Sequence, residues 1–142
     1  MFLLDSNVVS ELRRAKAGGT NARLAAWARG TPVGSLFISA ITVFELELGV
    51  LQRERRDAAQ GAILREWLDK HVLPAFRDRI LPIDAPVALR CARLHSPDPP
   101  SERDTLIAAT ALVHGLTVVT RSAGAFTRLG VSVLNPWVKR QE

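Results

Sequence analysis

Short apolar runs are spaced along the whole chain and are separated by longer, mixed stretches. The runs are too short for helices and are rich in Val, Ile, Leu and Phe, a pattern typical of strands buried on both faces of a sheet. Pro, Gly or polar residues follow most of them. We therefore predict five strands, at residues 2–4, 36–38, 79–81, 117–120 and 131–134.

Between these strands, apolar residues recur every three or four positions, which is the spacing of amphipathic helices. Asp84 is expected to cap the fifth helix, and Gly115 to end the sixth. Loops are predicted at 16–20, which holds two glycines, and at the proline-rich 96–100. The helices are predicted at residues 8–14, 21–29, 42–52, 56–72, 86–94, 106–114 and 123–129.

Strands that alternate with helices indicate an α/β fold. We predict a three-layer α/β/α sandwich with a mainly parallel central sheet. No repeat, linker or low-complexity segment divides the chain, so residues 1–142 are interpreted as a single domain. In such open sheets the ligand cleft lies beyond the carboxyl ends of the strands.

Composition narrows the setting and the class of partner. Cys91 is the one cysteine, which excludes an intrachain disulfide and a cysteine-rich metal site. There is neither a secretory leader nor an apolar stretch long enough to cross a membrane, so a cytoplasmic protein is expected. The net charge is +5, and 16 of the 19 basic residues are arginine, whose planar guanidinium suits phosphate. This favours a polyanionic partner.

Three acidic residues stand where an α/β fold gathers its ligands. Asp5 directly follows the first predicted strand, Glu45 lies after the second, and Asp104 precedes an apolar helix. Each also has a structural alternative. Asp5 would be a helix N-cap, Glu45 would close a capping box with Thr42, and Asp104 would close a looser one with Ser101.

Helical phase favours a functional role for two of these acids. Glu45 shares the helix face of Ile41 and Leu48, and Asp104 shares that of Ile107. A carboxylate in apolar surroundings is normally protonated, paired with a cation or bound to a metal. If all three acids converge, Mg²⁺ or Mn²⁺ is the natural occupant, and the chemistry that fits is phosphodiester hydrolysis without a histidine base.

Further polar residues flank the same segments. The hydroxyls of Ser6, Thr120 and Ser122 could orient a ligand or water. The alternative for each is a hydrogen bond to the nearby backbone, which is the preferred interpretation for Thr120. Four arginines are candidates for contacting a phosphate backbone, with a solvated surface as the alternative. They are Arg13, Arg14, Arg103 and Arg121.

Five segments, in chain order, resemble VapC-type PIN-domain toxins. The resemblance implies an α/β/α sandwich, Mg²⁺- or Mn²⁺-dependent endoribonuclease activity, a homodimer, and inhibition by a small antitoxin that itself binds promoter DNA. It places the first three acids of the family on Asp5, Glu45 and Asp104. With RNA as the substrate, the four arginines become candidate RNA contacts. The segments are LLDSNV (3–8), SAITVFEL (39–46) with Gly49 after it, DTLIAATA (104–111), LTVVTR (116–121) and LNPW (134–137).

The chain departs from the family at the fourth acid. After the fourth predicted strand the family has Asn or Asp and then a further Asp, whereas this chain has Ser122 and Ala125. A weak or inactive PIN-like domain that binds an antitoxin or RNA is therefore the alternative function. A dehalogenase-type phosphatase would need an Asp at Asn7, and a receiver domain a lysine near Arg121, so both are set aside.

Overall fold

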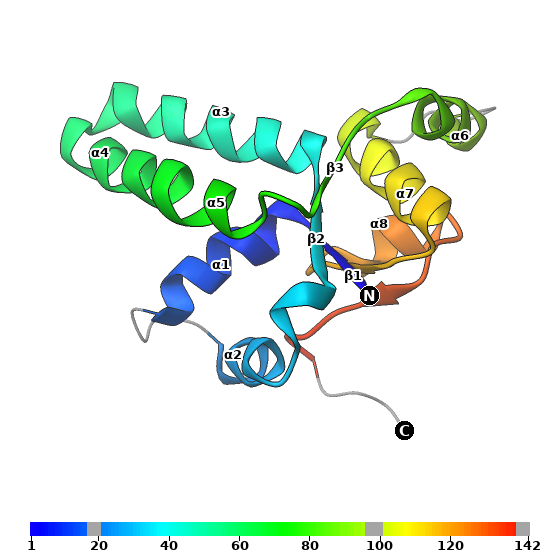
Figure 1. The fold of residues 1–142 in the computed structure, drawn as a ribbon, viewed down its shortest axis with the longest axis horizontal. Helices are drawn as coiled ribbons and strands as arrows, with labels where there is room; N and C mark the ends of the chain where they lie inside the picture. The colour runs from blue at the N-terminus through cyan, green and yellow to red at the C-terminus, as the bar shows by residue number, and fades with distance from the viewer. Residues whose placement is uncertain (17–20, 96–100, 139–142) are drawn as a thin grey trace.

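The structure, a computed structural model, describes residues 1–16, 21–95 and 101–138, in which strands and helices alternate (Figure 1). The strands are β1 (Phe2–Leu4), β2 (Leu36–Ser39), β3 (Ile80–Leu81), β4 (Thr117–Val119) and β5 (Val133–Leu134). The helices are α1 (Ser6–Lys16), α2 (Ala22–Arg29), α3 (Ala40–Arg56), α4 (Ala58–Trp67), α5 (Leu73–Ala75), α6 (Ala85–His95), α7 (Glu102–His114) and α8 (Ala123–Thr127). A 3₁₀ turn, η1 (Val33–Ser35), precedes β2. The loop predicted at 96–100 lies outside the described residues, as does the loop predicted at 16–20 except for Lys16, which ends α1.

All described strand pairs are parallel, and the strand order is β3-β2-β1-β4-β5. β1 lies in the middle, with Leu3 opposite Phe37 of β2 and Leu4 opposite Val119 of β4. Because β1 and β4 are parallel neighbours in register, the residues that follow them leave the sheet side by side. These residues are Asp5 and Thr120.

Two apolar cores lie on opposite faces of the sheet. Leu4 and Val119 belong to the core under α1, α3 and α4, whereas Leu3 and Val118 belong to the core under α7 and α8. Successive strand residues point to opposite faces, so this alternation places helices on both sides. Figure 1 shows α1 to α5 on one side of the sheet and α6 to α8 on the other. The predicted three-layer sandwich is confirmed.

Two predicted caps are confirmed. The Asp84 carboxylate accepts a hydrogen bond from the Val87 N–H at 3.2 Å, at the start of α6. Gly115 ends α7 in the left-handed conformation with φ 67°, which a residue with a Cβ adopts only under strain. Within the described ranges, no helix is both long enough and apolar enough to cross a bilayer.

The helix predicted over 56–72 is confirmed over 58–72, as α4 followed by a π-helical turn, but its predicted start is wrong. Asp57 is extended, with φ −153°, and its carboxylate caps α4 through the Gln60 N–H. At the other end, a π-helical turn, η2 (Leu68–Val72), carries the chain into α5. Pro74 follows that turn. It lacks an N–H and crowds the carbonyl four residues earlier, which accounts for the wider turn.

Two glycines with opposite surroundings predict opposite effects on stability. A Cβ at Gly61 of α4 would lie 2.5 Å from the Glu54 Cα of α3, so Gly61→Ala must push the two helices apart. We expect the free energy of unfolding to fall by about 1–3 kcal/mol, although alanine is the better helix former. A Cβ at Gly49 meets nothing within 4 Å, and Gly49→Ala should raise that free energy by about 0.5–1 kcal/mol. Urea denaturation of both variants would check the contrast, and a stabilised Gly61→Ala would contradict it.

Candidate active site

Asp5 lies at the carboxyl end of β1 and is 5% exposed. Its backbone carbonyl accepts hydrogen bonds from the Val8 and Val9 N–H groups, so it does occupy the N-terminal cap of α1, as its structural alternative proposed. Its carboxylate makes further contacts. Oδ1 accepts from the Ser6 N–H at 2.8 Å, and Oδ2 accepts from the Thr120 hydroxyl at 2.8 Å. Capping and a position at the sheet edge are therefore combined in one residue.

Thr120 corrects the preferred sequence interpretation. Its hydroxyl accepts a local hydrogen bond from the Ser122 N–H at 3.0 Å, but it also donates to Asp5 across 115 residues of sequence. The side chain is fully buried. Thr120 thus fixes the orientation of the Asp5 carboxylate. Ser122 contributes its backbone here, and the predicted role of its hydroxyl stays a prediction.

Asn7 is a site residue that sequence reasoning missed, because it was considered only as the position where a dehalogenase-type phosphatase would need an Asp. Its side-chain amide donates to Asp5 Oδ2 at 3.3 Å, and its carbonyl oxygen accepts from the Arg121 N–H at 3.4 Å. It therefore links Asp5 to the loop after β4. Its position two residues after the acid, directly beyond a strand, was the available signal.

Glu45 is not a capping residue. α3 begins earlier than predicted, at Ala40, and Ser39 caps it by accepting from the Ile41 N–H at 3.1 Å. Glu45 is thus in the second turn, where its Oε1 accepts from the Ser6 hydroxyl at 3.4 Å. The predicted helical phase explains this placement, since the face that bears Glu45 turns toward α1. The capping-box alternative with Thr42 is wrong.

Asp104 lies in the first turn of α7. Ser101, the N-cap residue, makes no side-chain capping hydrogen bond, so the predicted capping box does not form. A negative charge here is favoured by the helix dipole. Burial raises the pKa of Asp104, and the charge of Asp5 raises it further. Asp104 is therefore electrostatically coupled to the residue at the end of β1.

The three carboxylates repel one another. Burial raises the pKa of Asp5, although hydrogen bonds from Thr120 and Ser6 oppose the rise. The pKa of Glu45 is also raised, first by burial, then by Asp5 and to a smaller extent by Asp104. Within residues 1–16, 21–95 and 101–138, no three His, Cys, Asp or Glu side chains form a ready metal-binding group. The three acids thus share one region without forming a closed shell.

The four candidate arginines fall in different places. The Arg103 guanidinium lies 3.8 Å from Glu45 Oε2 and packs over the Phe44 ring at 5.1 Å, so it belongs to the acid cluster. Arg13 packs over a tryptophan of α4, and Arg14 pairs with Glu11 on α1. Arg121 packs over Trp137. Among the four, only Arg103 contacts one of the three acids.

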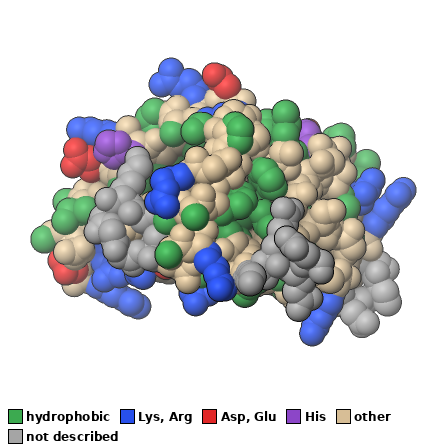
Figure 2. Space-filling model, turned by 90° about the horizontal axis from the view of Figure 1, so that it is seen from below, with side chains coloured by type: hydrophobic (Ala, Val, Ile, Leu, Met, Phe, Trp, Pro, Cys, Tyr) green, Lys and Arg blue, Asp and Glu red, His purple; other side chains and the backbone are tan. Residues whose placement is uncertain are grey.

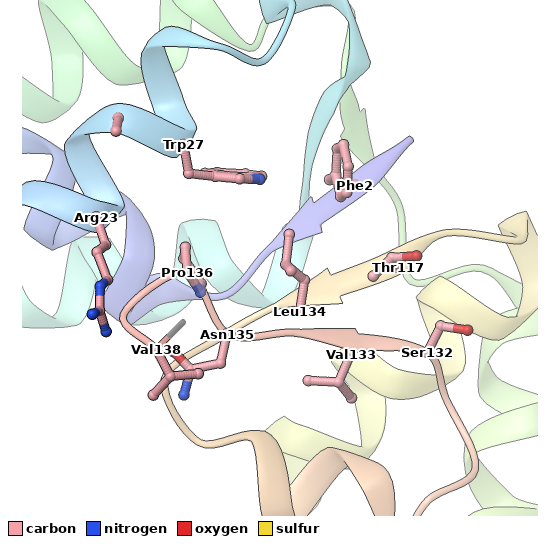
Figure 3. Close-up of a pocket in the computed structure, with 11 residues that line it drawn as sticks. Phe2, Arg23, Trp27, Thr117, Ser132, Val133, Leu134, Asn135, Pro136 and Val138 are labelled. Atoms are coloured by element: carbon pink, nitrogen blue, oxygen red, sulfur yellow. The ribbon is translucent and has the colours of Figure 1, made fainter. Parts of the chain in front are cut away.

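A cavity of about 1000 Å³ lies away from the candidate site, and Figure 3 shows Phe2, Trp27 and Leu134 around it. Its lining includes Phe2 and Thr117, which begin β1 and β4, and Leu134, which ends β5, but none of the three acids. A smaller groove of about 460 Å³ begins at Ser6, Glu45 and Arg103, at the carboxyl ends. By the topology of parallel sheets, the smaller one is the functional cleft.

The Thr120 hydroxyl supports a specific prediction. Thr120→Val keeps the shape but leaves the Ser122 N–H and Asp5 Oδ2 each short of a buried partner. We expect the free energy of unfolding to fall by about 1–3 kcal/mol and Mn²⁺ affinity to fall by about 10- to 100-fold. Denaturation and calorimetric titration would measure both, with Thr120→Ser restoring them. Equal Mn²⁺ affinity in Thr120→Val and wild type would contradict the role assigned to the hydroxyl.

Comparison with known proteins places this arrangement in a family. Residues 2–130 match the PIN domain. The chain is 41% identical to "Toxin FitB" of Neisseria gonorrhoeae, over 96% of this chain and 99% of that protein. It is 34% identical to "VapC ribonuclease Y4jK" of Sinorhizobium fredii, over 96% of this chain and 98% of that protein. A solved structure, "FitAB bound to IR36 DNA fragment", superposes with a TM-score of 0.84 at 37% identity, covering 99% of both chains. Because the family model matches residues 2–130, which is most of the chain, the chain belongs to the PIN-domain family.

Proposed function

We propose that this protein is a Mg²⁺- or Mn²⁺-dependent endoribonuclease and the toxin of a type II toxin–antitoxin pair. The relatives named above are a toxin and a VapC ribonuclease, and they are matched over nearly their whole length. The observation that carries the proposal is that Asp5, Glu45 and Asp104 share one region. Asp5 follows β1 at the carboxyl edge of the sheet, and its charge raises the pKa of Glu45 on α3 and of Asp104 on α7.

The donor set fits a hard divalent cation. Burial raises the pKa of each of the three carboxylates, and the charge of Asp5 raises the pKa of Glu45 and Asp104 further, so a cation would relieve both effects. Mg²⁺ and Mn²⁺ prefer oxygen ligands. Asp5, Glu45 and Asp104 are the residues that would hold the ion. Without it, Glu45 accepts a hydrogen bond from Ser6 and lies 3.8 Å from the Arg103 guanidinium.

The chain's own residues prepare this chemistry. When bound, a divalent cation supplies water activation and charge stabilisation at phosphorus. Thr120 and Asn7 hold the Asp5 carboxylate in one orientation from the side of the sheet. Arg103 presents a guanidinium beside Glu45, where it can neutralise a phosphate oxygen. No histidine contacts the three acids among the interactions described.

The absence of a fourth acid is offset in part by neutral groups. The Thr120 hydroxyl after β4 and the Asn7 amide of α1 both donate hydrogen bonds to Asp5, and the Ser122 N–H holds the Thr120 hydroxyl in place. Three carboxylates can still carry a single ion. We therefore favour an active nuclease over the passive antitoxin-binding or RNA-binding domain.

The partners and the location follow from the same proposal. Its substrate is RNA, its inhibitor is a cognate antitoxin, and its active form is a homodimer in the cytoplasm. The relative solved as "FitAB bound to IR36 DNA fragment" has DNA in its assembly. We propose that DNA reaches this chain only through its antitoxin.

Cleavage of RNA by the purified protein tests the proposal. A labelled, unstructured RNA should be cut in Mn²⁺ or Mg²⁺, should survive in EDTA, and should be cut again after the metal is restored. Addition of the co-purified antitoxin should stop the reaction. RNA that stays intact in every metal, together with Mn²⁺ titrations that show no binding, would favour the passive domain instead.

A further inference from the structure

A groove leads away from the acid cluster between α1 and α3. Its near end is formed by Ser6, Glu45 and Arg103, and its volume is about 460 Å³. One wall is a single face of α1, and the facing wall is a single face of α3, as their spacing of three or four residues requires. Leu64 and Trp67 of α4 complete the lining. The groove is therefore continuous with the candidate active site. The α1 wall consists of Ser6, Asn7, Ser10, Glu11, Arg13 and Arg14; the α3 wall includes Glu45, Leu48, Gly49, Gln52 and Arg53.

Both walls carry arginine at the same distance from the site. Arg14 lies eight residues after Ser6 on α1, and Arg53 lies eight residues after Glu45 on α3. At a helical rise of about 1.5 Å per residue, each arginine is about 12 Å along its helix from the acid cluster. Both arginines are exposed. The far end of the groove thus presents one arginine from each side, and Arg14 is also paired with Glu11 of the same wall at 3.4 Å.

Gly49 is the second, independent observation. It lies in the middle of α3, where glycine costs about 1 kcal/mol relative to alanine, and it lines the groove. Packing does not require it, since a Cβ there would meet nothing within 4 Å. By contrast, Gly61 of α4 is required by a close helix contact. A glycine without a packing role keeps the middle of the groove open to a ligand.

Net charge alone would not have located this surface. On the face seen in Figure 2, Lys and Arg side chains project from several places and do not form one patch. Arg90 and Arg93, for example, line a separate small hollow with Leu89 between α6 and α7. The groove differs because the same groove is lined by arginines and by Glu45 of the acid cluster.

From these features we infer that the groove binds the single-stranded RNA on one side of the cleaved phosphate. The inference rests on the proposed nuclease function. The strand leaves the acid cluster at Arg103, crosses the open surface over Gly49, and sets its backbone between Arg14 and Arg53.

A matched pair of double variants tests the charge at the far end. Arg14→Ala/Arg53→Ala and Arg90→Ala/Arg93→Ala remove the same charge from exposed helix positions inside and outside the groove. The probe is a fluorescently labelled, unstructured RNA in EDTA, with binding followed by anisotropy over a range of salt. The groove variant should bind at least about 10-fold more weakly, and its salt slope should fall by about 1.4, because about 0.7 is lost per phosphate contact of a single strand. The control should behave as wild type.

A second pair tests the open middle of the groove. Gly49→Phe should fill it and weaken RNA binding by at least about 10-fold. Gln60→Phe, on the exposed surface of α4, should not. Thermal unfolding would show whether both variants are folded. If Gly49→Phe does not fold, the two arginine double variants alone test the inference.

Several outcomes would overturn the inference. Equal losses in the two arginine pairs, or none in either, would remove the groove from the RNA path. Loss of antitoxin binding with RNA binding intact would make the groove a protein-binding surface. These results are distinct from failure of the proposed function, which would appear as a wild-type protein that binds RNA yet cuts none in Mn²⁺.

Discussion

Asp5→Asn is expected to lower Mn²⁺-dependent RNA cleavage by more than about 100-fold. Loss of a residue that only supports a metal ligand already costs about 10- to 100-fold, and Asp5 is proposed to hold the ion itself. Asn keeps an oxygen for the Ser6 N–H but removes the charge that raises the pKa values of Glu45 and Asp104. Initial rates on one RNA at saturating Mn²⁺ would measure the loss.

The control for this experiment is Asp78→Asn, an exposed acid in the turn before β3. It removes the same charge away from the sheet edge, so its cleavage rate should equal that of wild type. Circular dichroism should show both variants folded. An Asp5→Asn protein that cuts RNA at the wild-type rate would mean that the acid serves only as the cap of α1.

Mn²⁺ should stabilise the wild-type protein, and Asp104→Asn should remove that effect. A ligand that binds only the folded state adds about 2.7 kcal/mol of stability at 100 times its dissociation constant. Asp104 belongs to the proposed ligand set, and its charge is coupled to Asp5. Thermal unfolding with and without Mn²⁺ would show a raised midpoint in wild type only. Equal shifts in both proteins would place the ion elsewhere, and Asp78→Asn is again the matched control.

Without metal, Asp104→Asn should not lower the stability of the protein and should even raise it near neutral pH. The pKa of Asp104 is raised in the folded state by burial and by Asp5, so the folded protein holds this proton more tightly than the unfolded chain. Its contribution to stability is therefore present at low pH and is lost as the pH rises through the raised pKa. In EDTA near neutral pH, Asp104→Asn should be at least as stable as wild type. The difference should shrink in mild acid, and a variant that is less stable at neutral pH would contradict the repulsion.

Much of the fold was predictable because its signals are local. The apolar runs around Leu3 and Val118 and the stops at Gly115 and Asp84 mark the strands and the helix ends without reference to the rest of the chain. The family assignment was also predicted from segments in order. What the pattern missed depends on a single backbone detail, such as the extended Asp57 that divides α3 from α4, or the missing N–H of Pro74 beyond η2.

The site was predictable as a set of acids but not as a network. The end of the first apolar run pointed to Asp5, and the helical spacing of Ile41, Glu45 and Leu48 pointed to Glu45. The hydrogen bond from Thr120 to Asp5 joins residues 115 positions apart, and it arises only because β4 lies beside β1. The contact of Asn7 with the Arg121 N–H depends on the same neighbouring strands. The spacing of residues along the sequence does not predict which strands become neighbours, so it could not predict these contacts.

The most direct test of the central claim is a crystal structure of the protein grown with Mn²⁺, read from the anomalous signal of manganese. We predict one strong peak at the carboxyl edge of the sheet, with oxygens of Asp5, Glu45 and Asp104 each within about 2.0–2.6 Å of it. A peak that lacks any one of the three carboxylates, or no peak at this edge, would contradict the account.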